Sequence, residues 1–131
     1  MKRLILTILI VGVVVFISGM LTSHVKAQGP RIQIALVEFT QKVKLLDVLL
    51  KGRYLIVHDE VKMARGKPCT YVYRFRKDRS AELIVSFHCQ PVNREKAKQF
   101  TTVVSRISLT SDVLELREYQ FADSTEGHGV P

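Results

Sequence analysis

Hydrophobic residues follow two patterns along the chain, a long continuous run at the start and short alternating blocks afterwards. The run extends from Leu4 to Leu21, is preceded by two basic residues, and ends in a polar stretch with Val25 and Ala27 at the small-residue positions of a cleavage site. These features are typical of a secretory signal peptide, which we expect at residues 1–27. Residues 4–21 are also long enough to remain as an uncleaved hydrophobic helix that anchors the chain in a membrane. In both cases the rest of the chain is exported, to the periplasm or the extracellular space.

Beyond residue 27, apolar and polar positions alternate with the period of two that is typical of half-buried β-strands. Strands are predicted at residues 32–39, 40–46, 53–58, 69–76, 83–89, 100–107 and 113–121. Gly52 marks a turn that joins the second and third of these strands in a hairpin, and Pro91 is expected to end the fifth. The pattern therefore predicts a mainly β domain over residues 28–121, a small antiparallel sandwich or barrel of six to seven strands.

Two segments depart from this alternation. Asp59 is a suitable N-cap and Gly66 a suitable C-terminal residue for a helix, so one short helical turn is predicted at residues 60–65. Residues 122–131 are polar, contain two glycines and show no periodicity, which predicts a loop or a loose C-terminal tail.

The strands at 69–76 and 83–89 show the clearest alternation, with cysteine and aromatic side chains at odd positions of the first. One face of this hairpin should be buried and the other exposed. Folding the hairpin about Arg79 sets Cys69 directly opposite Cys89, and thiols so placed in an exported domain are expected to form a disulfide. The same register pairs Phe75 with Leu83, Tyr73 with Val85, and Tyr71 with Phe87.

The cysteine spacing favours a structural bridge over the alternatives of redox or metal chemistry. Redox-active pairs typically occur as C-x-x-C at the start of a helix, whereas Cys69 and Cys89 are far apart in the chain and lie next to aromatic residues. A loop of this size gives a stabilisation of roughly 3 kcal/mol in the entropy model.

Composition and charge limit the class of protein. A chain of 131 residues is long enough for one domain, and two cysteines cannot replace a hydrophobic core. The net charge is +8, and removal of residues 1–27 would leave +5. Nucleic acid is not expected as a partner of an exported domain, so the charge indicates either an anionic surface or envelope protein as partner, or solubility alone.

Histidines offer the sharpest alternative chemistry. His58, His88 and His128, with Met63, are ligand types that suit copper or zinc. No two of them have a spacing by which one strand or helical turn would present both, and His88 and His58 have structural explanations as a surface residue and a strand-end residue. If the C-terminal segment folds back, Glu126 and His128 could join a site with either of the other two histidines.

The tip of the 69–89 hairpin is a candidate anion-binding site. Arg74, Arg76 and Arg79 could bind a carboxylate or phosphate group through their guanidinium forks. The alternative is a solvated tip whose charge prevents edge-to-edge aggregation. No nucleophile elbow, phosphate loop or H-E-x-x-H motif is present, so neither catalysis nor a cofactor is expected.

Four stretches of the chain together resemble a group of small exported bacterial proteins without an assigned activity. The stretches are Gly52–Asp59, Met63–Tyr73, Val85–Val92 and Glu118–His128, and the similarity covers most of the chain after residue 27. The resemblance implies a signal peptide and one β-domain and brings no catalytic residue with it. It directs attention to His58, Cys69, His88, Cys89 and His128.

The sequence therefore predicts a non-catalytic binding or structural module of the periplasm or cell envelope. The alternative is a periplasmic copper- or zinc-binding protein that uses His58, His88 and His128.

Overall fold

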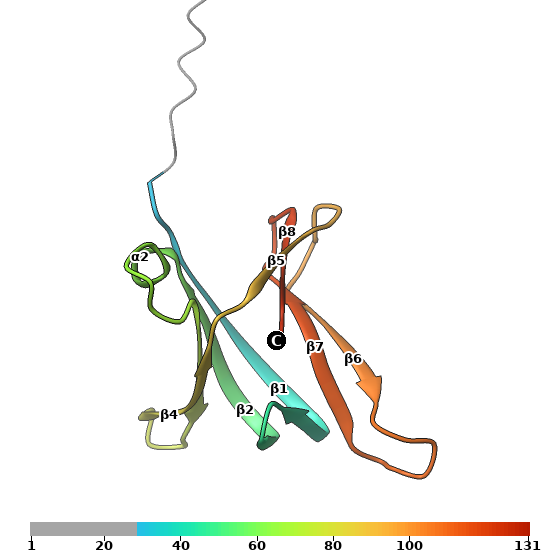
Figure 1. Cartoon of the computed structure of the whole chain (residues 1–131). Helices are drawn as coiled ribbons and strands as arrows, with labels where there is room; N and C mark the ends of the chain where they lie inside the picture. The colour runs from blue at the N-terminus through green and yellow to red at the C-terminus, as the bar shows by residue number, and fades with distance from the viewer. Residues whose placement is uncertain (1–28) are drawn as a thin grey trace, which may run out of the picture.

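The structure, a computed structural model, describes residues 29–131 and contains eight strands and one short helix within them (Figure 1). The strands are β1 (Ile32–Leu45), β2 (Val48–Asp59), β3 (Thr70–Phe75), β4 (Ala81–Phe87), β5 (Gln90–Asn93), β6 (Thr101–Arg106), β7 (Leu114–Gln120) and β8 (Glu126–Gly129), and the helix is α2 (Glu60–Ala64). The predicted mainly β class is confirmed, with eight strands in place of six or seven.

The signal peptide or membrane anchor predicted at residues 1–27 lies outside the described residues. Among the residues from 29 onward, no helix has the length and apolar character needed to span a membrane.

The strands form one curled sheet. Its order is β4-β3-β2-β1-β7-β8-β5, with β6 paired to β7 outside this path. All pairs are antiparallel except β1 with β7, which run parallel. Because β4 and β5 lie at opposite ends of this order but follow each other in the chain, the sheet curls until its two ends meet. Figure 1 shows β5 crossing from the side of β4 to a position beside β8.

The first hairpin is longer than predicted, and its turn lies elsewhere. The strands expected at 32–39 and 40–46 are one strand, β1, which turns at Leu46 and Asp47 into β2. Gly52, expected in the turn, lies within β2 opposite Phe39 with a φ of +96°. The ladder has a bulge next to this position. The glycine is therefore needed for an irregularity in the strand and not for the chain reversal.

The alternation of β2 positions the site. Side chains at even positions of this strand, including Leu50, Tyr54 and Ile56, are buried in the core, and His58 continues the same row. The core contains Phe39, Val43, Leu45, Leu50, Tyr54, Ile56, Val72, Phe87, Leu116, Tyr119 and Phe121. His58 therefore lies on the buried face at the end of β2, immediately before α2.

The helix α2 forms as the sequence predicts. Asp59 is its N-cap, and its side chain accepts a hydrogen bond from the backbone N–H of Lys62 at 2.9 Å. Gly66, with a φ of +74°, follows the helix and permits the chain to reverse towards Cys69.

The β3–β4 hairpin has a different register from the predicted one. The prediction set Cys69 directly opposite Cys89, whereas the ladder pairs Thr70 with Phe87. Near the tip, the two strands pair about a point one residue earlier in the chain than predicted, because Arg79 adopts a left-handed φ of 65° in the turn. A bulge between the Tyr73 and Val72 pairs then shifts the pairing part of the way back towards the predicted register. In place of the predicted pairs, Val72 faces Val85, Tyr73 faces Leu83, and Phe75 faces Ala81. Both cysteines therefore lie just outside the paired strands.

The expected division of this hairpin into a dry and an exposed face holds only in part. Thr70, Tyr71 and Val72 are all buried, so both faces are covered at the start of β3. Tyr119 of β7 hydrogen-bonds Thr70 and covers the face that was expected to be exposed. Leu83, expected in the dry face, is 50% exposed because it lies near the open tip of the hairpin.

The C-terminal segment is the largest departure from the predicted elements. Residues 126–129, expected in a loose tail, form β8 between β7 and β5. Pro91, expected to stop a strand, lies within β5, which is at the end of the strand order, where a missing backbone donor is tolerated. This added pair of strands completes the curl and places His128 in the interior.

Candidate metal centre

Two buried histidines lie against each other at the point where the sheet closes. His58 comes from the end of β2 and His128 from β8, and each is 1% exposed. Their ring centroids are 4.0 Å apart, with the ring planes inclined at 33°. The pair therefore joins segments that are seventy positions apart in the sequence.

Three of the four imidazole nitrogens have no hydrogen-bond partner among the described residues. These are both ring nitrogens of His58 and Nε2 of His128. A buried polar group left without a partner costs about 1–3 kcal/mol, so native proteins rarely keep several together without a reason. The fourth nitrogen, Nδ1 of His128, lies 3.6 Å from Oε1 of Glu126. The donor set is therefore poorly satisfied by the protein alone.

Burial keeps both imidazoles neutral at ordinary pH. Desolvation lowers the pKa of His58, partly offset by the nearby carboxylates of Glu60, Glu126 and Asp59. Desolvation, with a smaller contribution from His58, lowers the pKa of His128 to about 4. A neutral imidazole has a lone pair on one nitrogen, and this is the form that binds metal ions.

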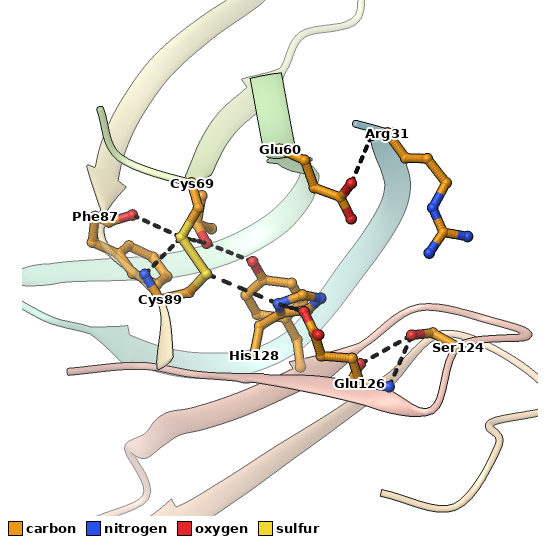
Figure 2. A network of polar contacts seen from close by, with 10 residues as sticks. Arg31, Glu60, Cys69, Phe87, Cys89, Ser124, Glu126 and His128 are labelled. Atoms are coloured by element: carbon orange, nitrogen blue, oxygen red, sulfur yellow. Dashed lines mark hydrogen bonds and ion pairs between the residues drawn. A yellow bond between two sulfur atoms is a disulfide. The ribbon is translucent and has the colours of Figure 1, made fainter. Parts of the chain in front are cut away.

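The predicted disulfide is present and borders the histidine pair. Cys69, which precedes β3, is bonded to Cys89, which lies between β4 and β5, and their Cα atoms are 6.1 Å apart. The bridge thereby ties the start of β3 to the short segment that links β4 with β5. Figure 2 shows the sulfur of Cys89 directed towards the ring of His128, where the Sγ to Nδ1 distance is 3.9 Å. Cys69 is 1% exposed, so the bridge is largely buried.

Candidate ligand atoms converge in two overlapping groups. In one, the donor atoms of His58, Cys69 and Cys89 all lie within 4.8 Å of one another. In the other, the same holds for His58, Glu126 and His128. His58 belongs to both groups, so it lies within 4.8 Å of both sulfurs and of the Glu126 carboxylate.

Aromatic residues pack against His128. The ring of Tyr119 is stacked on His128 at 5.0 Å, and Phe121 meets it edge-on at 5.9 Å. The Tyr119 hydroxyl shares a 2.5 Å hydrogen bond with Oγ1 of Thr70, and burial raises the pKa of this tyrosine. The tyrosine therefore stays neutral and forms a fixed wall of the site.

A salt bridge behind β8 holds His128 in place. Arg94 donates two hydrogen bonds to Glu118, at 2.8 and 2.7 Å, and this pairing lowers the pKa of the carboxyl group. Gly127 packs on the same carboxylate so closely that a Cβ there would overlap it. Glycine at this position therefore allows β8 to approach β7 and directs His128 into the interior.

The structure brings together only some of the residues predicted as ligands. His58, His128 and Glu126 meet, as expected if the C-terminal segment folded back. His88 and Met63 are exposed, and His88 belongs to neither group of ligand atoms found in residues 29–131.

The basic residues at the hairpin tip form a separate, shallow groove. Arg76 and Arg79 line it with Lys77, while Arg74 lies on the strand next to it. Arg76 is already paired with Glu82, and Glu38 contributes a negative charge to the groove. The structure therefore shows a positively charged surface here, but no enclosed anion-binding pocket.

From the sequence, the cysteines were predicted as a disulfide and the histidines as a separate candidate metal site. That the two lie next to each other was not predicted. One signal was available for His58, because its even position in β2 continues the apolar row from Leu50. No comparable signal marks His128, whose burial depends on pairing between β8 and two other strands.

Comparisons of the chain with protein-family models, curated proteins and solved structures found no match. Fold and side chains together define a small curled β-domain with a buried histidine pair beside a disulfide. What this site can do chemically follows from its own donor atoms.

Proposed function

We propose that this protein is a non-catalytic, exported metal-binding module that holds a zinc or copper ion through His58 and His128. Glu126 is the third ligand in the disulfide-bonded protein. This role develops the copper or zinc alternative from the sequence, with Glu126 in the place of His88.

The observation that carries the proposal is the set of three unpartnered imidazole nitrogens in a buried cluster. A metal ion would use one lone pair from each histidine and so compensate part of the cost of burying them. Neutral imidazole is a preferred ligand of zinc and copper, and low imidazole pKa values keep His58 and His128 in that form.

The charge of the ligand set also fits a divalent cation. Glu126 supplies one negative charge within reach of both histidines, and its side chain is 50% exposed, so it can rotate towards an ion. Glu118 adds a second carboxylate nearby, but its two oxygens are already held by Arg94. We therefore assign the ligand role to Glu126 alone.

A binding role is favoured over catalysis by the enclosure of the donors. Both histidines are 1% exposed, and Tyr119 and Phe121 pack on the ring of His128. Neither the surface groove beside Thr110 nor the one beside Arg76 is lined by these histidines. A substrate would therefore have to displace packed side chains to reach the ion.

Metal titration of the purified full-length protein tests the proposal. After removal of bound metal with a chelator, calorimetric titration with Zn²⁺ and with Cu²⁺ should show one ion per chain. H58Q and H128Q should each weaken binding by 10-fold or more, because each removes a ligand. H88Q is the matched control, since it removes an exposed histidine outside the cluster and should leave the affinity unchanged.

Circular dichroism of each variant shows whether it retains the β-fold. Absence of stoichiometric binding to the folded wild-type protein overturns the proposal. Equal loss of affinity in H88Q and H128Q would also overturn it, because the buried pair would then have no special role.

A further inference from the structure

We infer that the site is redox-gated: reduction of the Cys69–Cys89 disulfide supplies two thiolates that join His58 and His128 around the metal in a four-coordinate centre. This inference rests on the proposed function, because it uses the same two histidines. It adds the regulation of the site and the identity of its strongest ligands.

The positions of the donor atoms support this assignment. The ligand atoms of His58, Cys69 and Cys89 lie within 4.8 Å of one another, and Sγ of Cys89 is 3.9 Å from Nδ1 of His128. In a tetrahedral zinc site, bonds of about 2.3 Å to sulfur and about 2.0 Å to nitrogen place the donors roughly 3.3–3.8 Å apart. Separation of the two sulfurs and small side-chain rotations therefore suffice to reach that geometry.

The burial of these groups is a second, independent observation. His58 is 1% exposed and neither of its ring nitrogens has a partner, although both sulfurs lie within reach. In the oxidised state the sulfurs are bonded to each other and are weak ligands. Reduction converts them into thiolates beside His58, and thiolates are strong ligands of zinc and copper.

The strand arrangement keeps the four ligands close once the bridge opens. Cys69 is held between α2 and β3, where the backbone N–H of Asp59 donates to its carbonyl at 2.8 Å. Cys89 leads directly into β5, which is paired with β8 along the segment that contains His128. The backbone ladders therefore preserve the site after the covalent link is lost.

The chemistry balances with a dithiol as reductant. The dithiol transfers two electrons and two protons to the disulfide, the S–S bond breaks to give two cysteine thiols, and the reductant becomes a disulfide. Binding of M²⁺ then releases the two thiol protons to solvent and forms two metal–thiolate bonds, while both histidines bind as neutral ligands. Reoxidation takes the pair of electrons back to an oxidised dithiol partner and breaks both metal–sulfur bonds.

Thiolates should dominate the affinity of the reduced protein. Soft thiolate ligands suit Zn²⁺ and Cu⁺ better than a carboxylate, and Glu126 is half exposed and can leave the ion when the thiolates bind. By thermodynamic linkage, the factor by which reduction raises the metal affinity is also the factor by which bound metal shifts the disulfide equilibrium towards the reduced form. Each 10-fold difference in affinity corresponds to about 30 mV in the potential of the disulfide.

The test compares zinc affinity in the oxidised and reduced full-length protein. A phosphine is used as reductant in place of a dithiol, because a dithiol would itself bind zinc, and a chromophoric chelator competes for the ion. The expected result is at least a 100-fold gain in affinity on reduction. H58Q and H128Q should lower the affinity of the reduced protein by 10-fold or more, and H88Q should not change it.

Two measurements on the wild-type chain avoid dependence on cysteine variants, which could fail to fold. Co²⁺ bound to the reduced protein should show a thiolate-to-cobalt charge-transfer band. Zn²⁺ should also protect both Cys69 and Cys89 from alkylation, as measured by mass spectrometry. The H88Q control should show the same protection as the wild type.

The outcomes separate this inference from the proposed function. Zinc binding that depends on His58 and His128 but does not change on reduction overturns the gating and leaves the proposed function standing. Tight binding to the reduced protein that is unaffected by H58Q and H128Q shows a cysteine-only site and overturns this inference, whereas the proposed function is decided by the effect of the same two variants on the oxidised protein. Absence of zinc binding in both the oxidised and the reduced protein overturns the inference and the proposed function together.

Discussion

Acidification of the metal-free, disulfide-bonded protein should destabilise it through the two buried histidines. In the unfolded chain a histidine titrates near its ordinary pKa of about 6.5, whereas burial lowers the pKa of His128 to about 4 in the folded state. The unfolded state therefore binds more protons than the folded state between these values. The contribution of His128 to stability is complete above about pH 6.5 and is lost as the pH falls towards 4.

The size of the effect follows from the two pKa values. Integrating the proton linkage from pH 6.5 to pH 4.5 gives a loss of about 2 kcal/mol from His128 alone. His58, whose pKa is also lowered, adds a loss of the same sign. Arg94 lowers the pKa of the Glu118 carboxyl group, so its contribution to the loss of stability falls mainly below about pH 4.5. For a domain with a total stability of about 5–15 kcal/mol, a change of this size is easily measured.

Urea unfolding followed by far-ultraviolet circular dichroism, at several pH values between 4.5 and 7 and with a chelator present, measures this dependence. The H128Q variant provides the comparison, because it keeps a polar side chain in β8 but cannot titrate. Its free energy of unfolding should fall with acid by about 2 kcal/mol less than that of the wild type over this range. If the two proteins show the same slope, the buried histidine does not titrate as its environment implies, and the reasoning is refuted.

Two further changes test the packing around the site. Replacement of both Cys69 and Cys89 by alanine should lower the free energy of unfolding by about 3 kcal/mol in the chain-entropy model, and urea midpoints within error of the wild type would show that the bridge contributes nothing. G127A should destabilise the protein by about 1–3 kcal/mol, because the added methyl group overlaps the carboxylate of Glu118. G29A is its control, since a Cβ there meets no atom within 4 Å, and an equal effect of both variants on thermal unfolding would contradict the packing argument.

The parts of the fold that the sequence predicted are those set by local pattern. The alternation at 69–76, the turn near Arg79 and the N-cap at Asp59 all depend on neighbouring residues, and the structure contains the corresponding elements. The exact register did not follow, because a left-handed φ at Arg79 and a bulge in β4 leave no distinctive residue in the sequence. The disulfide could be predicted despite this error, because its formation needs only that the two ends of one hairpin lie close together.

The candidate site could not be predicted as a unit, because it is made by sheet closure. Glu126, Gly127 and His128 have weak strand preference, and β8 exists because β7 and β5 offer backbone partners on both of its sides. β5 is in position, in turn, because the chain passes directly from β4 through Cys89. The disulfide, the last strand and the histidine pair are therefore consequences of one closure, which brings both sulfurs within reach of the histidines. This shared origin is the physical reason to expect that redox state and metal affinity are coupled in this domain.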